Sequence, residues 1–165
     1  MIAVANAFCG DGYVVLRWDL PFRQVRPRGA PGGSGERDRE GIRTAADTLR
    51  QVAPGMPIYL AGQSYGGRQS SIAAAEDPGI ADGLLLLSYP LHPPGKPAQL
   101  RTDHFPSLRK PALFVHGTRD PFGTVEELKE AIKLIPANAR LQVVQGAGHG
   151  VPPATATSMP AWLAA

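Results

Sequence analysis

A short segment near the middle of the chain has the spacing of a catalytic serine. Residues 62–66 read G-Q-S-Y-G, a G-x-S-x-G pentapeptide that directly follows the apolar run 57–61. This pattern is typical of a sharp turn from a strand into a helix, which exposes a serine hydroxyl at the end of a sheet. A hydroxyl attacks a carbonyl group only after a base has taken its proton, so the chemistry also requires a histidine and an acid.

Two later residues can supply these groups. Asp120 follows the apolar run 112–116, and His149 lies in a glycine-rich segment, residues 145–150. A carboxylate beside an imidazole fixes its tautomer and stabilises the imidazolium that forms. The chain order Ser, Asp, His is also the order that accompanies this turn. These residues predict Ser64 as nucleophile, Asp120 as acid and His149 as base.

Each of the three residues also has an ordinary structural interpretation. Ser64 could cap a helix, Asp120 could cap the turn before Pro121, and His149 could be a plain surface residue. His116 is a second candidate base, although we expect it to be crowded against the sheet. We prefer the catalytic interpretation because all three residues are expected at one edge of the sheet. Three independent errors of assignment would otherwise have to coincide there.

The elements that must position these residues alternate along the chain. Short apolar runs and segments of helical period follow one another, which predicts an α/β fold with a mostly parallel sheet and helices on both faces. We expect strands at 13–17, 57–62, 83–88, 112–116 and 140–144. We expect helices at 37–52, after Ser64, and from Thr124, where T-V-E-E has the pattern of a capping box.

A glycine- and proline-rich loop, residues 27–35, leaves the carboxyl end of the first predicted strand. Ligands of open α/β sheets bind at this edge. Arg23, Arg26 and Arg28 could therefore face a substrate carboxylate or phosphate. A solvated basic loop is the competing and more common interpretation, because most surface arginines bind nothing.

Composition limits the class of protein. The 165 residues, 43% of them hydrophobic, predict one globular domain. The 17 basic and 14 acidic residues give a net charge of +3. The basic residues are not gathered in a tract, so we do not expect the protein to bind nucleic acid. His92 and His104 lack metal-ligand spacing, and a single cysteine, Cys9, excludes an intrachain disulfide and a multi-thiolate zinc site. We expect Cys9 to be a small packed residue.

These features predict a small-molecule substrate and no metal or other cofactor. No apolar run is long enough to span a bilayer, and the first residues lack the basic region of a signal peptide. We therefore expect a cytoplasmic protein that does not bind membranes.

Four segments carry a family resemblance. Residues 62–68 (GQSYGGR), 87–97 (LSYPLHPPGKP), 117–123 (GTRDPFG) and the pair Gly148-His149 resemble the small α/β hydrolases related to dienelactone hydrolases and to the nonspecific-lethal complex subunit three. The resemblance runs from about Gly12 to His149. It implies an α/β-hydrolase fold, with Ser64 as nucleophile, Asp120 as acid, His149 as base and the Tyr65 N–H in the oxyanion hole.

The chain departs from this family at its beginning. Such proteins carry an earlier strand that ends in a His-Gly loop, and a backbone N–H of that loop is the second oxyanion donor. Residues 1–8 have the composition of the end of the helix that would follow this loop. We therefore expect residues 1–165 to form a single domain that is incomplete at its N-terminus and lacks the N-terminal strands. Loss of one donor typically costs about 3 kcal/mol of transition-state stabilisation.

Two functions remain open. The first is a serine hydrolase that acts on an ester-like bond of a small substrate. The short segment 89–110 between two predicted strands leaves no room for a lid domain, so we expect an open cleft. The alternative is a catalytically weak or inactive hydrolase-like domain for protein interaction. A nucleotide-binding domain is less favoured, because neither G-x-G-x-x-G nor a P-loop motif is present.

Overall fold

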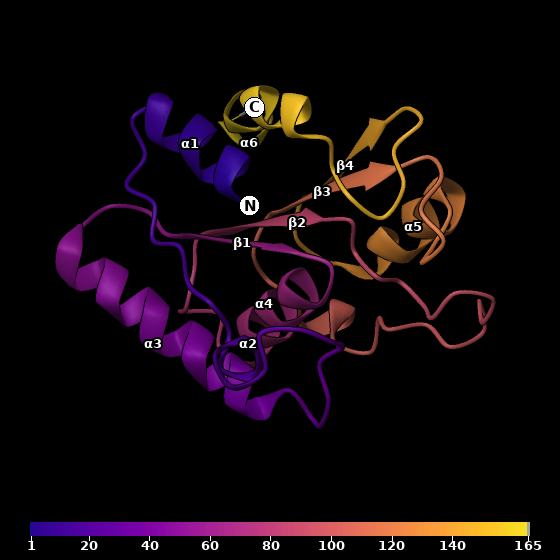
Figure 1. Ribbon diagram of the computed structural model, residues 1–165, viewed down its shortest axis with the longest axis horizontal. Coiled ribbons are helices and arrows are strands. Elements are labelled where there is room, and N and C mark those ends of the chain that lie inside the picture. Colours follow the sequence, from indigo (N-terminus) through magenta and orange to yellow (C-terminus); the bar gives the residue numbers. More distant parts are fainter. Residues whose placement is uncertain (165) are drawn as a thin grey trace.

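A parallel sheet lies between two layers of helices in the computed structural model, which describes residues 1–164 (Figure 1). Its four strands are β1 (Tyr59–Gln63), β2 (Gly83–Leu87), β3 (Ala112–Gly117) and β4 (Ala139–Val144), in the order β1-β2-β3-β4. The α-helices are α1 (Ile2–Gly10), α2 (Pro21–Val25), α3 (Glu36–Val52), α4 (Tyr65–Glu76), α5 (Val125–Ala131) and α6 (Met159–Ala164). The 3₁₀-helices are η1 (Phe105–Ser107), η2 (Ile132–Leu134) and η3 (Pro153–Ser158).

The register of the strands brings their carboxyl ends to one edge. Gln63 at the end of β1 pairs with Leu87 at the end of β2, and Gly117 at the end of β3 pairs with Val144 at the end of β4. Since all three pairings are parallel, the loops that follow the strands emerge on the same side. The residues that the sequence predicts as catalytic all lie in these loops.

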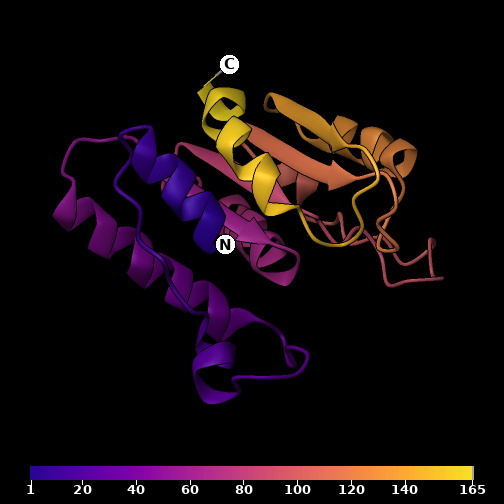
Figure 2. The same ribbon diagram turned by 45° about the horizontal axis from the view of Figure 1, so that its top comes forward.

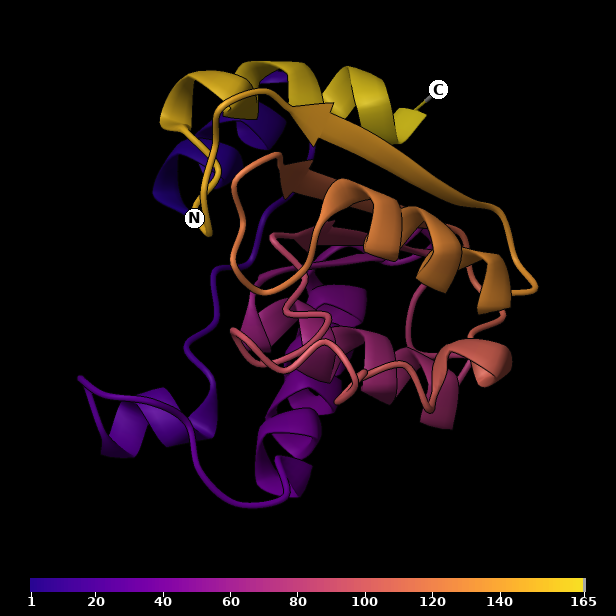
Figure 3. The same cartoon turned by 90° about the vertical axis from the view of Figure 1, so that its right-hand side faces the viewer.

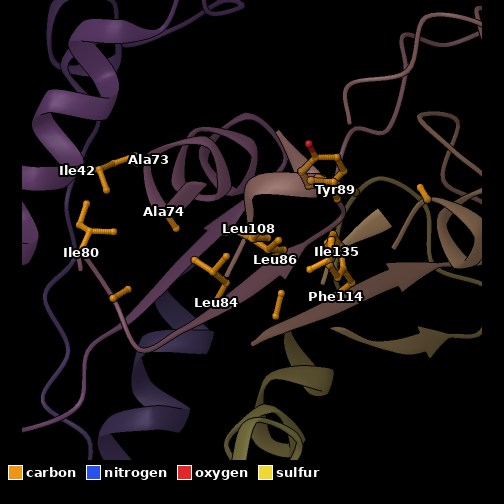
Figure 4. Close-up of a cluster of buried hydrophobic side chains, with 14 of the residues drawn as sticks. Ile42, Ala73, Ala74, Ile80, Leu84, Leu86, Tyr89, Leu108, Phe114 and Ile135 are labelled. Atoms are coloured by element: carbon orange, nitrogen blue, oxygen red, sulfur yellow. The ribbon is translucent and has the colours of Figure 1, made fainter. Parts of the chain in front are cut away.

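The central strand β2 has the sequence Gly-Leu-Leu-Leu-Leu because both of its faces are covered. Leu84 and Leu86 pack in the cluster with α3, α4 and α5, part of which Figure 4 shows. Leu85 and Leu87 pack on the opposite face with residues of α1, η3 and α6. Figure 3 shows these helices on the two sides of the sheet.

The predicted capping box is present at the start of α5. The Thr124 hydroxyl accepts a hydrogen bond from the Glu127 N–H at 3.1 Å, and the Glu127 carboxylate accepts one from the Thr124 N–H at 2.7 Å. These two bonds satisfy N–H groups that a helix start otherwise leaves without partners. The Thr124 N–H and the Thr124 hydroxyl both donate to the Glu127 carboxylate, and these two bonds lower the pKa of Glu127.

The predicted strand at 13–17 is wrong. Residues 13–20 form no regular secondary structure and pair with no strand, and β1 is the edge of the sheet in residues 1–164. A groove of about 730 Å³ separates this segment from β1. The alternation of the segment is real, since Tyr13 and Val15 pack on the core while Val14 and Leu16 are exposed, but a strand also needs a neighbour within hydrogen-bonding distance.

Two further features of the helices bear on the sequence-based expectations. Cys9 is exposed, so the expectation of a packed cysteine is wrong. The reason is helical spacing: Val4 and Phe8 of α1 face the sheet, and the next residue points away. None of the helices in the described part of the chain is both long and apolar enough to cross a membrane. Figure 2 shows α2 and the loop after it at one end of α3, away from the sheet.

Candidate active site

The pentapeptide forms a tight turn from β1 into α4. Ser64 has φ 52° and ψ −121°, an uncommon conformation for a residue with a side chain. The strand and the helix approach closely behind it: a Cβ atom on Gly67 would lie 2.7 Å from the carbonyl oxygen of Gly62, and one on Gly62 would meet the nitrogen of Gly67. Glycine is therefore required at both positions for the turn to hold Ser64 at the sheet edge.

Ser64, His149 and Asp120 form one hydrogen-bonded chain. The Ser64 Oγ is 2.7 Å from His149 Nε2, and His149 Nδ1 is 2.9 Å from both carboxylate oxygens of Asp120. The Asp120 side chain is fully buried, whereas the His149 side chain retains 23% of its exposure. Ser64 makes no capping hydrogen bond to α4, so the capping interpretation of this serine is wrong.

Asp120 combines both interpretations offered by the sequence. Its Oδ1 accepts a hydrogen bond from the Phe122 N–H at 2.9 Å, which caps the turn, and the same carboxylate contacts His149. The turn therefore holds in place the carboxylate that contacts His149. The Phe122 ring also stacks on the His149 ring, with centroids 4.0 Å apart.

The loop that carries His149 is tied to its neighbours. The Arg119 Nε donates to the carbonyl oxygen of Gly146 at 2.8 Å, and the Gly146 N–H donates to the Thr118 hydroxyl at 2.9 Å. The Gln63 side-chain amide lies 3.4 Å from the carbonyl oxygen of His149. Together with the stacking of Phe122, these contacts restrict the imidazole to one orientation.

The second candidate base, His116, lies behind Asp120. Its ring is fully buried, its Nε2 donates to the carbonyl oxygen of Gly123 at 2.8 Å, and its Nδ1 is 3.8 Å from Asp120 Oδ2. It has no hydrogen bond to Ser64 within residues 1–164. The preference for His149 over His116 thus agrees with the geometry.

Tyr65 is the first residue of α4, directly after Ser64. Backbone N–H groups in a first helical turn have no partner within the helix, which suits the oxyanion role predicted for the Tyr65 N–H. That role stays a prediction. The phenol donates to Asp38 Oδ2 at 2.6 Å, and Asp38 Oδ1 accepts from the Phe22 N–H at 2.8 Å. Burial and the Asp38 carboxylate raise the pKa of Tyr65.

Sequence reasoning missed Asp38 as a residue of this site. It is buried in the first turn of α3, and its partners lie 16 and 27 positions away, so no local pattern reveals the contact. The acidic start of a helix was its only sequence signal. Its carboxylate links α2, α3 and the beginning of α4 beside the nucleophile.

The three arginines of the early loop do not contact the serine, histidine and aspartate. Arg23 donates to carbonyl oxygens of its own loop, at 3.0 Å for Pro27 and 3.3 Å for Gly29, and its guanidinium lies 4.7 Å from the centre of the Phe22 ring. Arg26 and Arg28 are exposed. A role for the three in substrate binding stays a prediction.

The described residues 1–164 form neither a lid nor a metal site over the serine, histidine and aspartate. Between β2 and β3, only the 3₁₀-helix η1 interrupts an irregular segment, so the prediction of a fold without a lid is confirmed. Within residues 1–164, no three His, Cys, Asp or Glu side chains gather as a metal site would require. Instead, His92 contacts Glu127 and the carbonyl oxygen of Pro93.

The family model described as alpha/beta hydrolase domain matches residues 1–160, and the chain belongs to this family. Among solved structures, it is similar to Est1E with bound ferulic acid from Butyrivibrio proteoclasticus (21% identity, TM-score 0.73, 99% of this chain and 83% of that one). It is also similar to dienelactone hydrolase from Anabaena variabilis (22% identity, TM-score 0.60, 79% of this chain and 58% of that one). At these identities the structures show the fold alone.

One curated relative is similar over a short stretch. The polyketide synthase ThaQ of Burkholderia thailandensis is 50% identical over 50 residues, which are 30% of this chain and 2% of that protein. The match thus spans only a small part of the larger protein.

Proposed function

We propose that this member of the α/β hydrolase family is a serine hydrolase that cleaves an ester-like bond of a small substrate. The observation that supports this most is the continuous chain from Ser64 Oγ through His149 to Asp120, with links of 2.7 and 2.9 Å. Nucleophile and base lie within hydrogen-bonding reach, and the base is oriented by a third group, as covalent catalysis by serine requires.

In the first proposed step, Ser64 Oγ attacks the carbonyl carbon while His149 Nε2 accepts the hydroxyl proton. Asp120 stabilises the resulting imidazolium at Nδ1, and the Tyr65 N–H donates to the oxyanion. When the intermediate collapses, the bond to the leaving group breaks and His149 gives its proton to that group. In the second step, His149 takes a proton from water and the resulting hydroxide attacks the carbonyl carbon of the acyl enzyme. The bond from that carbon to Ser64 Oγ then breaks, His149 returns the proton to Ser64 Oγ, and a carboxylic acid is released.

The choice of an acyl substrate has separate support. Est1E, which shares the fold, is described with ferulic acid bound. Ferulic acid is a carboxylic acid, the class of product that this two-step mechanism releases. The absence of a lid domain in the segment between β2 and β3 also suits a small substrate that enters from solvent.

A fluorophosphonate probe tests the proposal, because it reacts covalently with an activated serine and much more slowly with an unactivated one. We expect labelling of the wild type and none of Ser64→Ala. Ser71→Ala is the matched control, since Ser71 Oγ also lies close to a histidine, 2.8 Å from His104 Nε2, but is fully buried and has no partnering acid. Equal labelling of wild type and Ser64→Ala would refute Ser64 as nucleophile.

A second function is favoured by one observation. The outer edge of β1 pairs with no strand in residues 1–164, and such an edge can accept a strand from another chain. If the folded wild type is not labelled, the hydrolase proposal fails and a catalytically weak or inactive interaction domain takes its place.

A further inference from the structure

Two acidic residues are buried in the described part of the chain, residues 1–164, and they are Asp120 and Asp38. Asp120 is the acid proposed for catalysis. Asp38 retains only 3% of its exposure, and none of the ion pairs within the same residues includes it. Burying a carboxylate is costly unless hydrogen bonds replace those to water. The place of Asp38 therefore depends on the groups that bond to it.

Both carboxylate oxygens of Asp38 accept a hydrogen bond. Oδ1 accepts one from the Phe22 N–H at 2.8 Å, and Oδ2 accepts one from the Tyr65 hydroxyl at 2.6 Å. The Tyr65 ring also packs edge-on against the Phe22 ring, with centroids 5.1 Å apart. Burial and then the bond to Asp38 raise the pKa of Tyr65, so the phenol stays protonated and donates. Asp38 thus fixes the far end of the side chain that directly follows Ser64.

The beginning of α3, which carries Asp38, is itself held against α4. Gly35 directly precedes α3, and a Cβ atom on it would lie 2.6 Å from the side-chain amide of Gln69 in α4. The Gln69 side chain also accepts a hydrogen bond from Arg39 Nη1 at 3.1 Å. Because α3 and α4 are in contact here, Asp38 binds Tyr65 from a fixed position.

The turn between Ser64 and Tyr65 needs such support. Ser64 has φ 52° and ψ −121°, and this ψ sets the plane of the peptide group that carries the Tyr65 N–H. An uncommon conformation of this kind persists only where neighbouring contacts enforce it. The Ser64 N–H donates to the carbonyl oxygen of Leu87 at 2.8 Å, and the Ser64 carbonyl oxygen accepts from the Arg68 N–H at 3.0 Å. The bond from Tyr65 to Asp38 adds a third restraint, made by side chains.

We propose that Asp38 is a positioning residue for the oxyanion site. Through the Tyr65 hydroxyl, it holds the first residue of α4 so that the Tyr65 N–H points at the oxygen of the tetrahedral intermediate. A donor stabilises that oxygen best when it is already oriented, because no free energy is then spent on turning it during the reaction. In this role Asp38 acts through Tyr65 rather than on the substrate. The inference rests on the proposed hydrolase function and adds a residue to it.

Tyr65→Phe tests the bond with little disturbance, because it removes one oxygen and keeps the ring that packs on Phe22. For 4-nitrophenyl butyrate, kcat should fall about 10- to 100-fold and KM should change less than about twofold, since the oxyanion forms only after binding. A trifluoromethyl ketone adds to a catalytic serine and forms a tetrahedral oxyanion, so its inhibition constant should rise by a similar factor. Asp38→Asn should act alike, and the double variant should be no slower than the slower single variant, because all three lack the same bond.

Tyr89→Phe is the matched control, since it also removes a tyrosine hydrogen bond, the one of 2.7 Å to the carbonyl oxygen of Arg101. It should leave kcat, KM and the inhibition constant within about twofold of the wild-type values. A smaller folded fraction would lower kcat but leave the inhibition constant unchanged, so the ketone separates positioning from stability. If Tyr65→Phe matches Tyr89→Phe, or lowers kcat without weakening the ketone, Asp38 does not position the oxyanion site.

Hydrogen exchange separates this inference from the hydrolase proposal, because it requires no activity. The Ser64 and Arg68 amides should exchange about tenfold faster in Tyr65→Phe and Asp38→Asn, but not in Tyr89→Phe. Ester cleavage by the wild type with an unchanged kcat in Tyr65→Phe would refute the inference and leave the hydrolase intact. If the wild type neither cleaves the ester nor reacts with the fluorophosphonate, the hydrolase proposal fails. Faster exchange would then retain Asp38 as the residue that holds the turn, and unchanged exchange would refute both.

Discussion

Because β1 and α4 lie in close contact, we expect alanine substitutions at two adjacent glycines, Gly66 and Gly67, to change the stability of the protein in opposite directions. In Gly67→Ala, the new methyl group would lie 2.7 Å from the carbonyl oxygen of Gly62 and 3.2 Å from its carbonyl carbon. In Gly66→Ala, no atom lies within 4 Å of the new methyl group. Both glycines belong to the first turn of α4, so their helix propensities largely cancel in the comparison.

The magnitudes follow from what can move. Replacing glycine by alanine at an unstrained helical position stabilises a protein by about 0.4–1 kcal/mol. At Gly67 the opposing atoms belong to the backbone, and no change of rotamer can relieve the overlap. Overpacking of this kind costs about 1–3 kcal/mol. We therefore expect Gly66→Ala to be neutral or slightly stabilising and Gly67→Ala to be destabilising by about 1–3 kcal/mol.

In Gly67→Ala, the end of β1 and the start of α4 must move apart to make room for the methyl group. Ser64 lies between these two segments, so we expect it to be displaced as well. A misplacement of about 1 Å can slow a catalysed step by about 100-fold. Urea unfolding would measure stability, and the rate of fluorophosphonate labelling, corrected for the folded fraction, would measure the reactivity of Ser64. If Gly67→Ala is as stable and as reactive as Gly66→Ala, the close approach is not what shapes this turn.

Three further predictions concern other contacts. Asp120→Asn should keep the turn but slow labelling about 10⁴-fold, as loss of the orienting carboxylate does in comparable sites; unchanged labelling would remove Asp120 from the mechanism. Thr124→Ala should cost about 1 kcal/mol in urea unfolding and Thr124→Ser much less, since only the first loses the capping oxygen; equal losses would point to packing instead. Burial, followed by the charge of Arg68, lowers the pKa of His104 to about 4, so the unfolded chain binds more protons between pH about 6.5 and 4. As the pH falls through that window, the free energy of unfolding should therefore fall, by about 2 kcal/mol at pH 5 from this group. His104→Gln should make the free energy of unfolding less dependent on pH; an equally steep profile would show that His104 does not cause the dependence.

Much of the fold could be predicted because its signals are local. The strands β2 and β3 are short apolar runs and β4 is a shorter-range alternation of apolar and polar residues, and the structure places all three within a residue or two of the predicted bounds. The capping box at Thr124 uses two residues three positions apart, and both of its bonds are present. The signal for the turn at Ser64 is also local. Gly62 and Gly67 lie within five positions of each other, and each is glycine because a Cβ atom there would overlap the backbone of the other.

The errors arise where structure depends on distant parts of the chain. Residues 13–17 alternate as a strand does, yet pairing requires a partner that the segment cannot specify by itself. Asp38 gives another example, since the hydroxyl and the N–H that it binds come from Tyr65 and Phe22. Cys9 lies one position after the buried Phe8 in α1, and one helical position is enough to turn a side chain from the core to solvent.

The two serine–histidine pairs of this chain show that distance alone does not identify a nucleophile. Ser64 lies 2.7 Å from His149, and Ser71 lies 2.8 Å from His104. A base must tolerate the proton that it accepts. His149 has the Asp120 carboxylate on its far side to stabilise that charge, whereas burial and Arg68 both oppose protonation of His104. Ser71 is also fully buried, so a substrate could not reach it. The acid behind the imidazole, rather than the serine–histidine contact, is therefore what should direct a fluorophosphonate to Ser64.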